Sequence, residues 1–129
     1  MLRFRYNKSE RPPAPYIVVE IAPARRRRKP IRRRAKLDSG ASLTIIPEGL
    51  IRRWRIPPLR AVTLRAYNGS ESIRFTYLVD IIIGTRRFQD VEVTAAPRRT
   101  ILFGRNIMNK LRITLDGMQE EVEIHDVQI

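Results

Sequence analysis

The chain has 129 residues, of which 43% are hydrophobic, and a formal net charge of +13. This length is typical of one domain, and the apolar fraction suffices for a hydrophobic core. There is no cysteine and only one histidine, His125, which excludes disulfides, thiolate zinc sites and a cysteine nucleophile. We therefore expect no metal and no other cofactor.

No stretch approaches the roughly 18 consecutive apolar residues that span a bilayer, so no membrane association is expected. The charged N-terminal residues also lack the apolar core of a signal peptide. These two observations favour a cytoplasmic location.

The N-terminal third predicts an arm followed by a hairpin. Residues 1–15 carry scattered charges and several prolines, which predicts an extended arm ahead of a domain over residues 16–129. Strands are predicted at residues 16–21, which are β-branched and aromatic, and at residues 31–37. The basic run Arg25–Lys29 lies between these two strands, so we expect it at the tip of a hairpin rather than in a disordered tail.

The middle of the chain predicts a short helix and a second hairpin. After a strand at residues 42–46, residues 48–55 place Leu50, Ile51 and Trp54 at roughly helical spacing. Two β-rich runs then bracket Asn68-Gly69, which predicts a hairpin at about residues 61–79. Asn-Gly is typical of a type I′ turn, because both central positions of that turn need positive φ.

The C-terminal third continues with strands. Residues 80–83 and 88–94 flank a Gly84-Thr85 turn, and residues 100–103 form an apolar strand that leads into a short helix. A last hairpin is predicted at about residues 112–129. Repeated short strands with turn signals predict an all-β barrel or sandwich.

One aspartate stands apart from the other carboxylates. Asp38 lies in the segment Leu37-Asp38-Ser39-Gly40-Ala41, between two predicted strands. Small residues after an aspartate allow a tight turn and the close approach of another chain. Taken alone, however, an aspartate at the start of a tight turn is commonplace.

Two further features favour a functional role for the segment at Asp38. A glycine-tipped hairpin follows about thirty residues later, and Leu102-Phe103-Gly104-Arg105-Asn106 then leads into the short helix. In this order and spacing the chain resembles the retropepsins, the single-domain aspartic proteases of retroviruses and their cellular and bacterial relatives. The resemblance implies an acid-protease barrel with one lobe per chain and one short helix after the Gly-Arg-Asn segment.

The resemblance also implies roles for individual residues. Asp38 is the catalytic aspartate, Ser39 locks the two active-site loops together through its hydroxyl, and Gly40 and Ala41 offer backbone groups and space to the substrate. The remaining matches are the flap tip, the substrate pocket and the segment that supports the active-site loop: Tyr67, Asn68, Gly69 and Ser70; Ile45 and Leu102; Gly104, Arg105 and Asn106.

The chain departs from the retroviral pattern at Ser42. Retroviral enzymes usually carry an aspartate at this position, which grips the substrate backbone and pairs with the arginine of Gly-Arg-Asn. Arg105 must therefore find another partner. The flap has one glycine, Gly69, where many viral flaps have several.

Asp-Ser-Gly occurs once, whereas this class of protease needs two carboxylates that share one proton. The expected protein is therefore a homodimer with one Asp38 from each subunit, cleaving an extended peptide. Two alternatives remain: a binding or dimerisation module of the same fold without turnover, and an arginine-rich nucleic-acid-binding domain. The nucleic-acid alternative is disfavoured because the basic segment contains no aromatic residue for base stacking and the sequence predicts no recognition helix.

Overall fold

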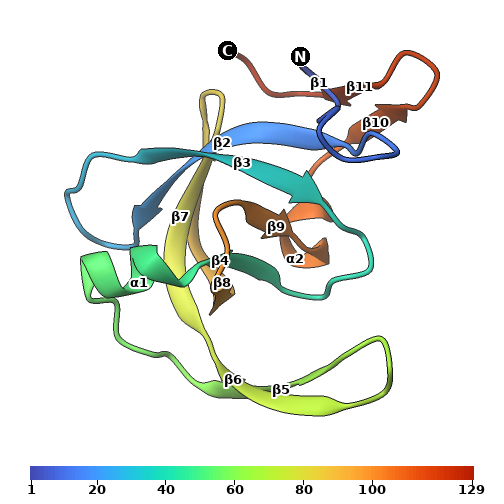
Figure 1. Ribbon diagram of the computed structural model, residues 1–129. Coiled ribbons are helices and arrows are strands. Elements are labelled where there is room, and N and C mark those ends of the chain that lie inside the picture. The colour runs from blue at the N-terminus through green and yellow to red at the C-terminus, as the bar shows by residue number, and fades with distance from the viewer.

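A closed barrel of six strands forms the body of the protein (Figure 1). The structure is a computed structural model that describes residues 1–129. Around the barrel the strands follow the order β2 (Tyr16–Pro23), β3 (Ile31–Leu37), β9 (Ile101–Phe103), β4 (Thr44–Pro47), β8 (Arg86–Ala96) and β7 (Tyr77–Ile83). The predicted all-β class is confirmed.

The core lies inside the barrel because apolar residues alternate along the strands. In β2, Ile17, Val19 and Ile21 are all buried, as the two-residue period of a strand requires. Helix α1 (Glu48–Trp54) adds Leu50 and Trp54 to the same cluster. Each such side chain stabilises the fold by about 1.5–3 kcal/mol relative to an exposed one.

A two-stranded hairpin projects from the barrel at the bottom of Figure 1. It consists of β5 (Ala61–Arg65) and β6 (Glu71–Phe75), with Leu64 opposite Ser72. The predicted hairpin is present, but it is shorter than residues 61–79 because Tyr77 already belongs to β7.

The predicted type I′ turn is wrong. Within the turn only Gly69 has positive φ, at 85°, and its N–H donates to the carbonyl of Ala66 at 2.9 Å. This is a three-residue loop with glycine at the left-handed position. Asn68 stays out of that region while its Oδ1 accepts hydrogen bonds from the N–H and hydroxyl of Ser70.

The two ends of the chain meet in a separate sheet at the top of Figure 1. Its strand order is β1 (Leu2–Arg5), β11 (Glu121–Ile124) and β10 (Ile113–Asp116), and Leu2 lies opposite Ile124. Part of the predicted arm is therefore a strand. The predicted C-terminal hairpin is β10–β11, which follows the short helix α2 (Arg105–Met108).

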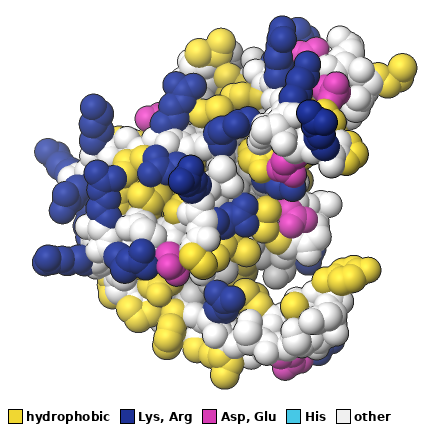
Figure 2. Space-filling view, in the orientation of Figure 1, with side chains coloured by type: hydrophobic (Ala, Val, Ile, Leu, Met, Phe, Trp, Pro, Cys, Tyr) yellow, Lys and Arg dark blue, Asp and Glu magenta, His cyan; other side chains and the backbone are white.

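Basic side chains crowd one half of the surface in Figure 2, over α1, β3 and the β2–β3 loop. Two arginines of that loop have structural contacts. Arg25 pairs with Asp90 at 3.2 Å, and the Arg26 guanidinium donates to the carbonyls of Trp54 and Arg55. Arg26 thereby satisfies carbonyls at the end of α1. Neither helix is long and apolar enough to cross a membrane.

Candidate active site

Asp38 follows directly on β3, and its backbone is tied to the neighbouring strand. Its N–H donates to the carbonyl of Phe103 in β9 at 3.0 Å, and its carbonyl accepts the N–H of Ala41 at 3.2 Å. The side chain is half-buried, and Oδ1 accepts the N–H of Gly40 at 2.9 Å. Oδ2 has no hydrogen-bond partner within the chain, so this oxygen can meet a second group.

Gly40 leaves room for this hydrogen bond because it has no Cβ. A Cβ at this position would lie 3.1 Å from Asp38 Oδ1, which is tighter than ordinary van der Waals contact. Ser39 and Gly40 are exposed, so the main chain of the loop and the Ser39 side chain are accessible to a second molecule.

Arg105 has found a partner in the backbone of the same loop. Its Nη1 donates to the carbonyl of Ser39 at 2.7 Å, and its N–H donates to the carbonyl of Ala41 at 2.8 Å. The carbonyl of Ser42 accepts the N–H of Asn106 at 3.3 Å. The start of α2 thus braces the loop without an aspartate at position 42.

A buried network fixes the strand that leaves the loop. Asn106 Oδ1 accepts hydrogen bonds from the N–H and the hydroxyl of Thr44, both at 2.9 Å. The Thr44 oxygen in turn accepts the N–H of Gly104 at 3.1 Å, and Asn106 Nδ2 donates to the carbonyl of Glu92 at 2.8 Å. Thr44 is fully buried. This network joins β4, β8 and α2 beneath the Asp38 loop.

Sequence reasoning missed Thr44 and Glu92. A threonine directly before an apolar strand carries no signal of its own, and the role of Glu92 depends on the parallel pairing of β4 with β8. Both need knowledge of which strands are neighbours.

The predicted pocket residues lie together. Ile45 and Leu102 are directly opposite each other across β4 and β9, and both are half-buried. A pocket of about 260 Å³, with five hydrophobic residues among the nine that line it, was not predicted. It lies where α1, the base of the hairpin and β8 meet, and its hydrophobic lining is Ile51, Ile73, Phe75, Tyr77 and Ala95.

The hairpin tip stands away from the barrel within one chain. Residues 66–70 are all exposed, and Tyr67 has no surrounding contact that lowers its exposure. In Figure 1 the tip lies on the same side of the barrel as the loop after β3. A single chain leaves this tip without a partner.

An ion pair links the base of the hairpin to the barrel. Arg60 lies just before β5 and binds Glu92 of β8 through Nε at 2.7 Å and Nη2 at 3.0 Å. The hydrogen bonds from Arg60, and then from Thr76, hold the pKa of the Glu92 carboxyl below its ordinary value. The backbone carbonyl of Glu92 also accepts the hydrogen bond from Asn106 Nδ2. Glu92 therefore connects both the hairpin and the active-site loop to β8.

The lowered pKa of Glu92 predicts a loss of stability in acid. A carboxyl with a depressed pKa in the folded state stabilises the fold above its ordinary value of 4.5, and this contribution is lost as the pH falls through the depressed value. In the wild type, the free energy of unfolding should therefore decrease as the pH falls below 4.5. Glu92→Gln should make this decrease smaller, by about 1 kcal/mol or less because the pair is partly exposed. Urea denaturation at a series of pH values measures this.

Glu20 provides the control for that experiment. It is exposed and makes no side-chain hydrogen bond, so Glu20→Gln should retain the wild-type steepness in acid. If both variants showed the same pH profile as wild type, the Arg60 pair would contribute nothing to stability.

No group of three or more histidine, cysteine, aspartate or glutamate side chains is arranged to hold a metal ion.

Residues 29–110 match the model of a protein family described as "gag-polyprotein putative aspartyl protease". The match contains the Asp38 loop, the hairpin and the Gly104–Asn106 segment, and it covers more than half of the chain. The chain belongs to this family. It is a retropepsin-like aspartic protease by family and fold, as the resemblance implied. No curated protein sequence matches it.

Solved structures of other retropepsin-like proteases share the fold. A retropepsin-like aspartic protease from Rickettsia conorii is 13% identical, with a TM-score of 0.61, over 95% of this chain and 88% of that one. The simian foamy virus protease is 23% identical, with a TM-score of 0.56, over 74% and 92%. The EIAV protease, in complex with an inhibitor, is 18% identical, with a TM-score of 0.55, over 75% and 86%. At these identities the similarity establishes the barrel architecture.

Proposed function

We propose that this family member is an active aspartic endopeptidase and that its active site is completed by a second copy of the chain. The observation that carries the proposal is the Asp38 loop. Its carboxyl keeps one oxygen without a partner, on a loop that β9 and Arg105 hold in place. A single copy of Asp-Ser-Gly in the chain means that the second carboxyl must come from another subunit.

In the proposed dimer the two Asp38 carboxyls face each other and share one proton. Two close carboxylates cannot both be ionised without strong repulsion, so one is protonated while the other is charged. The charged carboxylate takes a proton from a water molecule as it attacks the peptide carbonyl, and the protonated one donates to that carbonyl oxygen. The proton taken from the water then passes to the amide nitrogen as the C–N bond breaks, and a hydroxyl proton of the tetrahedral intermediate returns to the other carboxylate.

The other expected site residues act around this pair. Ser39 of each subunit bonds across to the opposite loop, and Gly40 and Ala41 leave room for the substrate backbone. The substrate lies extended, so its main chain pairs with the loop and with the hairpin tip, residues 67–70, while alternate side chains enter apolar pockets. Ile45 and Leu102 line one such pocket, and closure of the hairpin excludes water.

Cleavage of a peptide library at a series of enzyme concentrations tests the proposal. We expect scission between apolar residues, inhibition by hydroxyl-bearing mimics of the tetrahedral intermediate, and a rate per subunit that falls on dilution as the dimer dissociates. Sedimentation velocity at the same concentrations gives the dimer fraction. A stable dimer that cleaves no peptide of the library would instead support a binding module of the same fold.

A further inference from the structure

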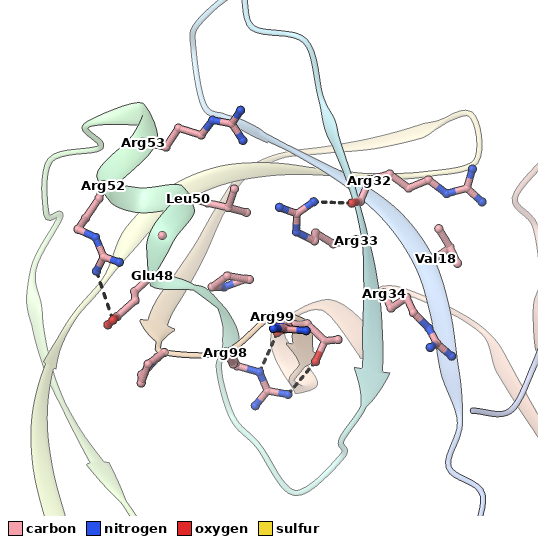
Figure 3. Close-up of a pocket in the computed structure, with 14 residues that line it drawn as sticks. Val18, Arg32, Arg33, Arg34, Glu48, Leu50, Arg52, Arg53, Arg98 and Arg99 are labelled. Atoms are coloured by element: carbon pink, nitrogen blue, oxygen red, sulfur yellow. Dashed lines mark hydrogen bonds and ion pairs between the residues drawn. The ribbon is translucent and has the colours of Figure 1, made fainter. Parts of the chain in front are cut away.

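A basic groove lies outside the Asp38 loop, between β3, the start of α1 and the loop before β9 (Figure 3). Its volume is about 870 Å³, and none of residues 38–42 lines it. Seven arginines and a single acidic residue do: Arg32, Arg33, Arg34, Arg52, Arg53, Arg98, Arg99 and Glu48.

The positive charge of this groove is almost uncompensated within the chain. Only Arg52 has a carboxylate partner, Glu48, at 3.2 Å. Arg98 donates instead to the carbonyl and hydroxyl of Thr100. Gathering like charges along one concave surface is unfavourable on its own, and an anion that enters relieves the repulsion.

Arg33 lies where the barrel pattern predicts a core residue. It is on the same face of β3 as Ala35 and Leu37, which are buried, and it is itself half-buried. Figure 3 shows its guanidinium pointing from β3 toward α1, into the space that Arg53 and Arg99 border. The side chain is thus directed into the groove instead of along a solvated face.

The groove also contains an open strand edge. β9 pairs with β3 only at Ala35–Leu37, so the first half of β3 has β2 on one side and no strand on the other. The N–H of Leu37 donates toward Pro15 on the β2 side. Because these bonds alternate along an antiparallel pair, the main-chain groups of Arg32 point to the open edge.

A contact inside the groove supports this direction. The carbonyl of Arg32 accepts a hydrogen bond from Arg33 Nη1 at 2.9 Å. The Arg33 side chain thus satisfies the carbonyl of Arg32, which has no hydrogen bond from a neighbouring strand. An incoming strand could replace this bond and free the guanidinium for a carboxylate.

We propose that this groove binds an extended, acidic segment of a partner protein. The segment adds as a strand to the open edge of β3, and its aspartate or glutamate side chains bind the arginines, whose planar forks match carboxylates. Nucleic acid fits the groove less well, because no aromatic side chain lines it for base stacking. The proposal concerns binding and does not depend on cleavage at Asp38.

Fluorescence anisotropy tests the proposal with a labelled peptide in which glutamate alternates with threonine, at physiological salt. All proteins carry Asp38→Asn, so that the probe stays intact. The groove variant combines Arg33→Gln, Arg53→Gln and Arg99→Gln. The control combines Arg27→Gln, Arg28→Gln and Lys29→Gln, which removes the same charge at exposed positions outside the groove.

The groove variant should bind the peptide at least about tenfold more weakly, and the control should change its affinity less than about threefold. Peptide binding should also slow hydrogen exchange at the amides of Arg32 and Arg34. Circular dichroism checks the fold, and Arg33→Gln alone replaces the triple variant if that variant does not fold.

Three outcomes would overturn the proposal. Equal losses of peptide affinity in the two triple variants would show that the peptide is attracted by net charge alone and not by the groove. Unchanged exchange at Arg32 and Arg34 in the bound state would exclude strand addition. A polyuridylate probe that depends on the groove arginines, while the acidic peptide does not, would make nucleic acid the partner.

Discussion

Replacing Asp38 by asparagine should lower kcat/KM for peptide cleavage by at least about 10³-fold, because the dimer loses both its base and its acid. The fold should remain, since the substitution keeps the shape of the side chain and removes repulsion between two carboxyls. Steady-state kinetics measures the first effect and denaturant unfolding the second. Asp126→Asn is the matched control: it removes the same charge at an exposed position with φ of 58°, which asparagine tolerates.

Asp38→Ala guards against slow conversion of the asparagine back to aspartate and should be equally inactive. Cleavage at the wild-type rate by either variant, with Asp126→Asn also unchanged, would remove Asp38 from the chemistry.

Mixing experiments show whether two subunits share one site. If wild-type and Asp38→Asn chains exchange freely and mixed dimers are inactive, activity falls as the square of the wild-type fraction, to about one quarter in an equal mixture. If each chain works alone, the same mixture retains about half. The second result would contradict the shared site while leaving a role for Asp38.

Replacing Gly104 by alanine should destabilise the protein by about 3 kcal/mol or more and also lower activity. An added Cβ would lie 2.6 Å from the carbonyl carbon and oxygen of Leu43 and 2.9 Å from the nitrogen of Thr44. All three are backbone atoms, which cannot turn away as a flexible side chain does. The backbone of Gly104 itself is ordinary, with φ of −93°, so the effect comes from contact alone.

The contact lies at the start of β4, where the chain leaves the active-site loop. Relief of the clash must therefore displace residues 43 and 44 relative to Gly104 and loosen the hydrogen bonds to Asn106. Urea unfolding measures the stability, and kcat/KM reports the position of the loop. Gly49→Ala is the control: nothing lies within 4 Å of its added Cβ, and alanine in a helix is favoured by up to about 1 kcal/mol. Wild-type stability in Gly104→Ala would contradict the tight packing at this position.

Much of this architecture follows from the order of residues along the chain. The β2–β3 hairpin is predicted by a local pattern, two apolar strands around a basic run. The Asp38 loop and the Gly104–Asn106 segment stand out only through their order and spacing, which resemble those of the retropepsins. The partner of Arg105 was not predicted, because every residue has a backbone carbonyl and the sequence does not show which one a side chain binds. With Ser42 in place of an aspartate, Arg105 binds the backbone carbonyl of Ser39 in the same loop.

Features that depend on distant pairings were also out of reach. The open edge of β3 in the basic groove exists because β9 begins only at Ile101, opposite Ala35, and the exact ends of strands are poorly defined by local sequence. The type I′ expectation failed for a local reason instead. Two turns suit Asn-Gly between strands, and side-chain hydrogen bonds to Asn68 favour the one that needs positive φ only at Gly69.

The pairing of β1 with β11 has a consequence for how the chain folds. Leu2 reaches its partner Ile124 only after the long segment between them has been synthesised. Until then its backbone groups and apolar side chain have no native neighbour. Pairings between segments so distant in sequence slow folding, because the entropy of a long loop is lost before any contact compensates. We therefore expect the terminal sheet to form late on the ribosome, after the barrel strands that precede β10.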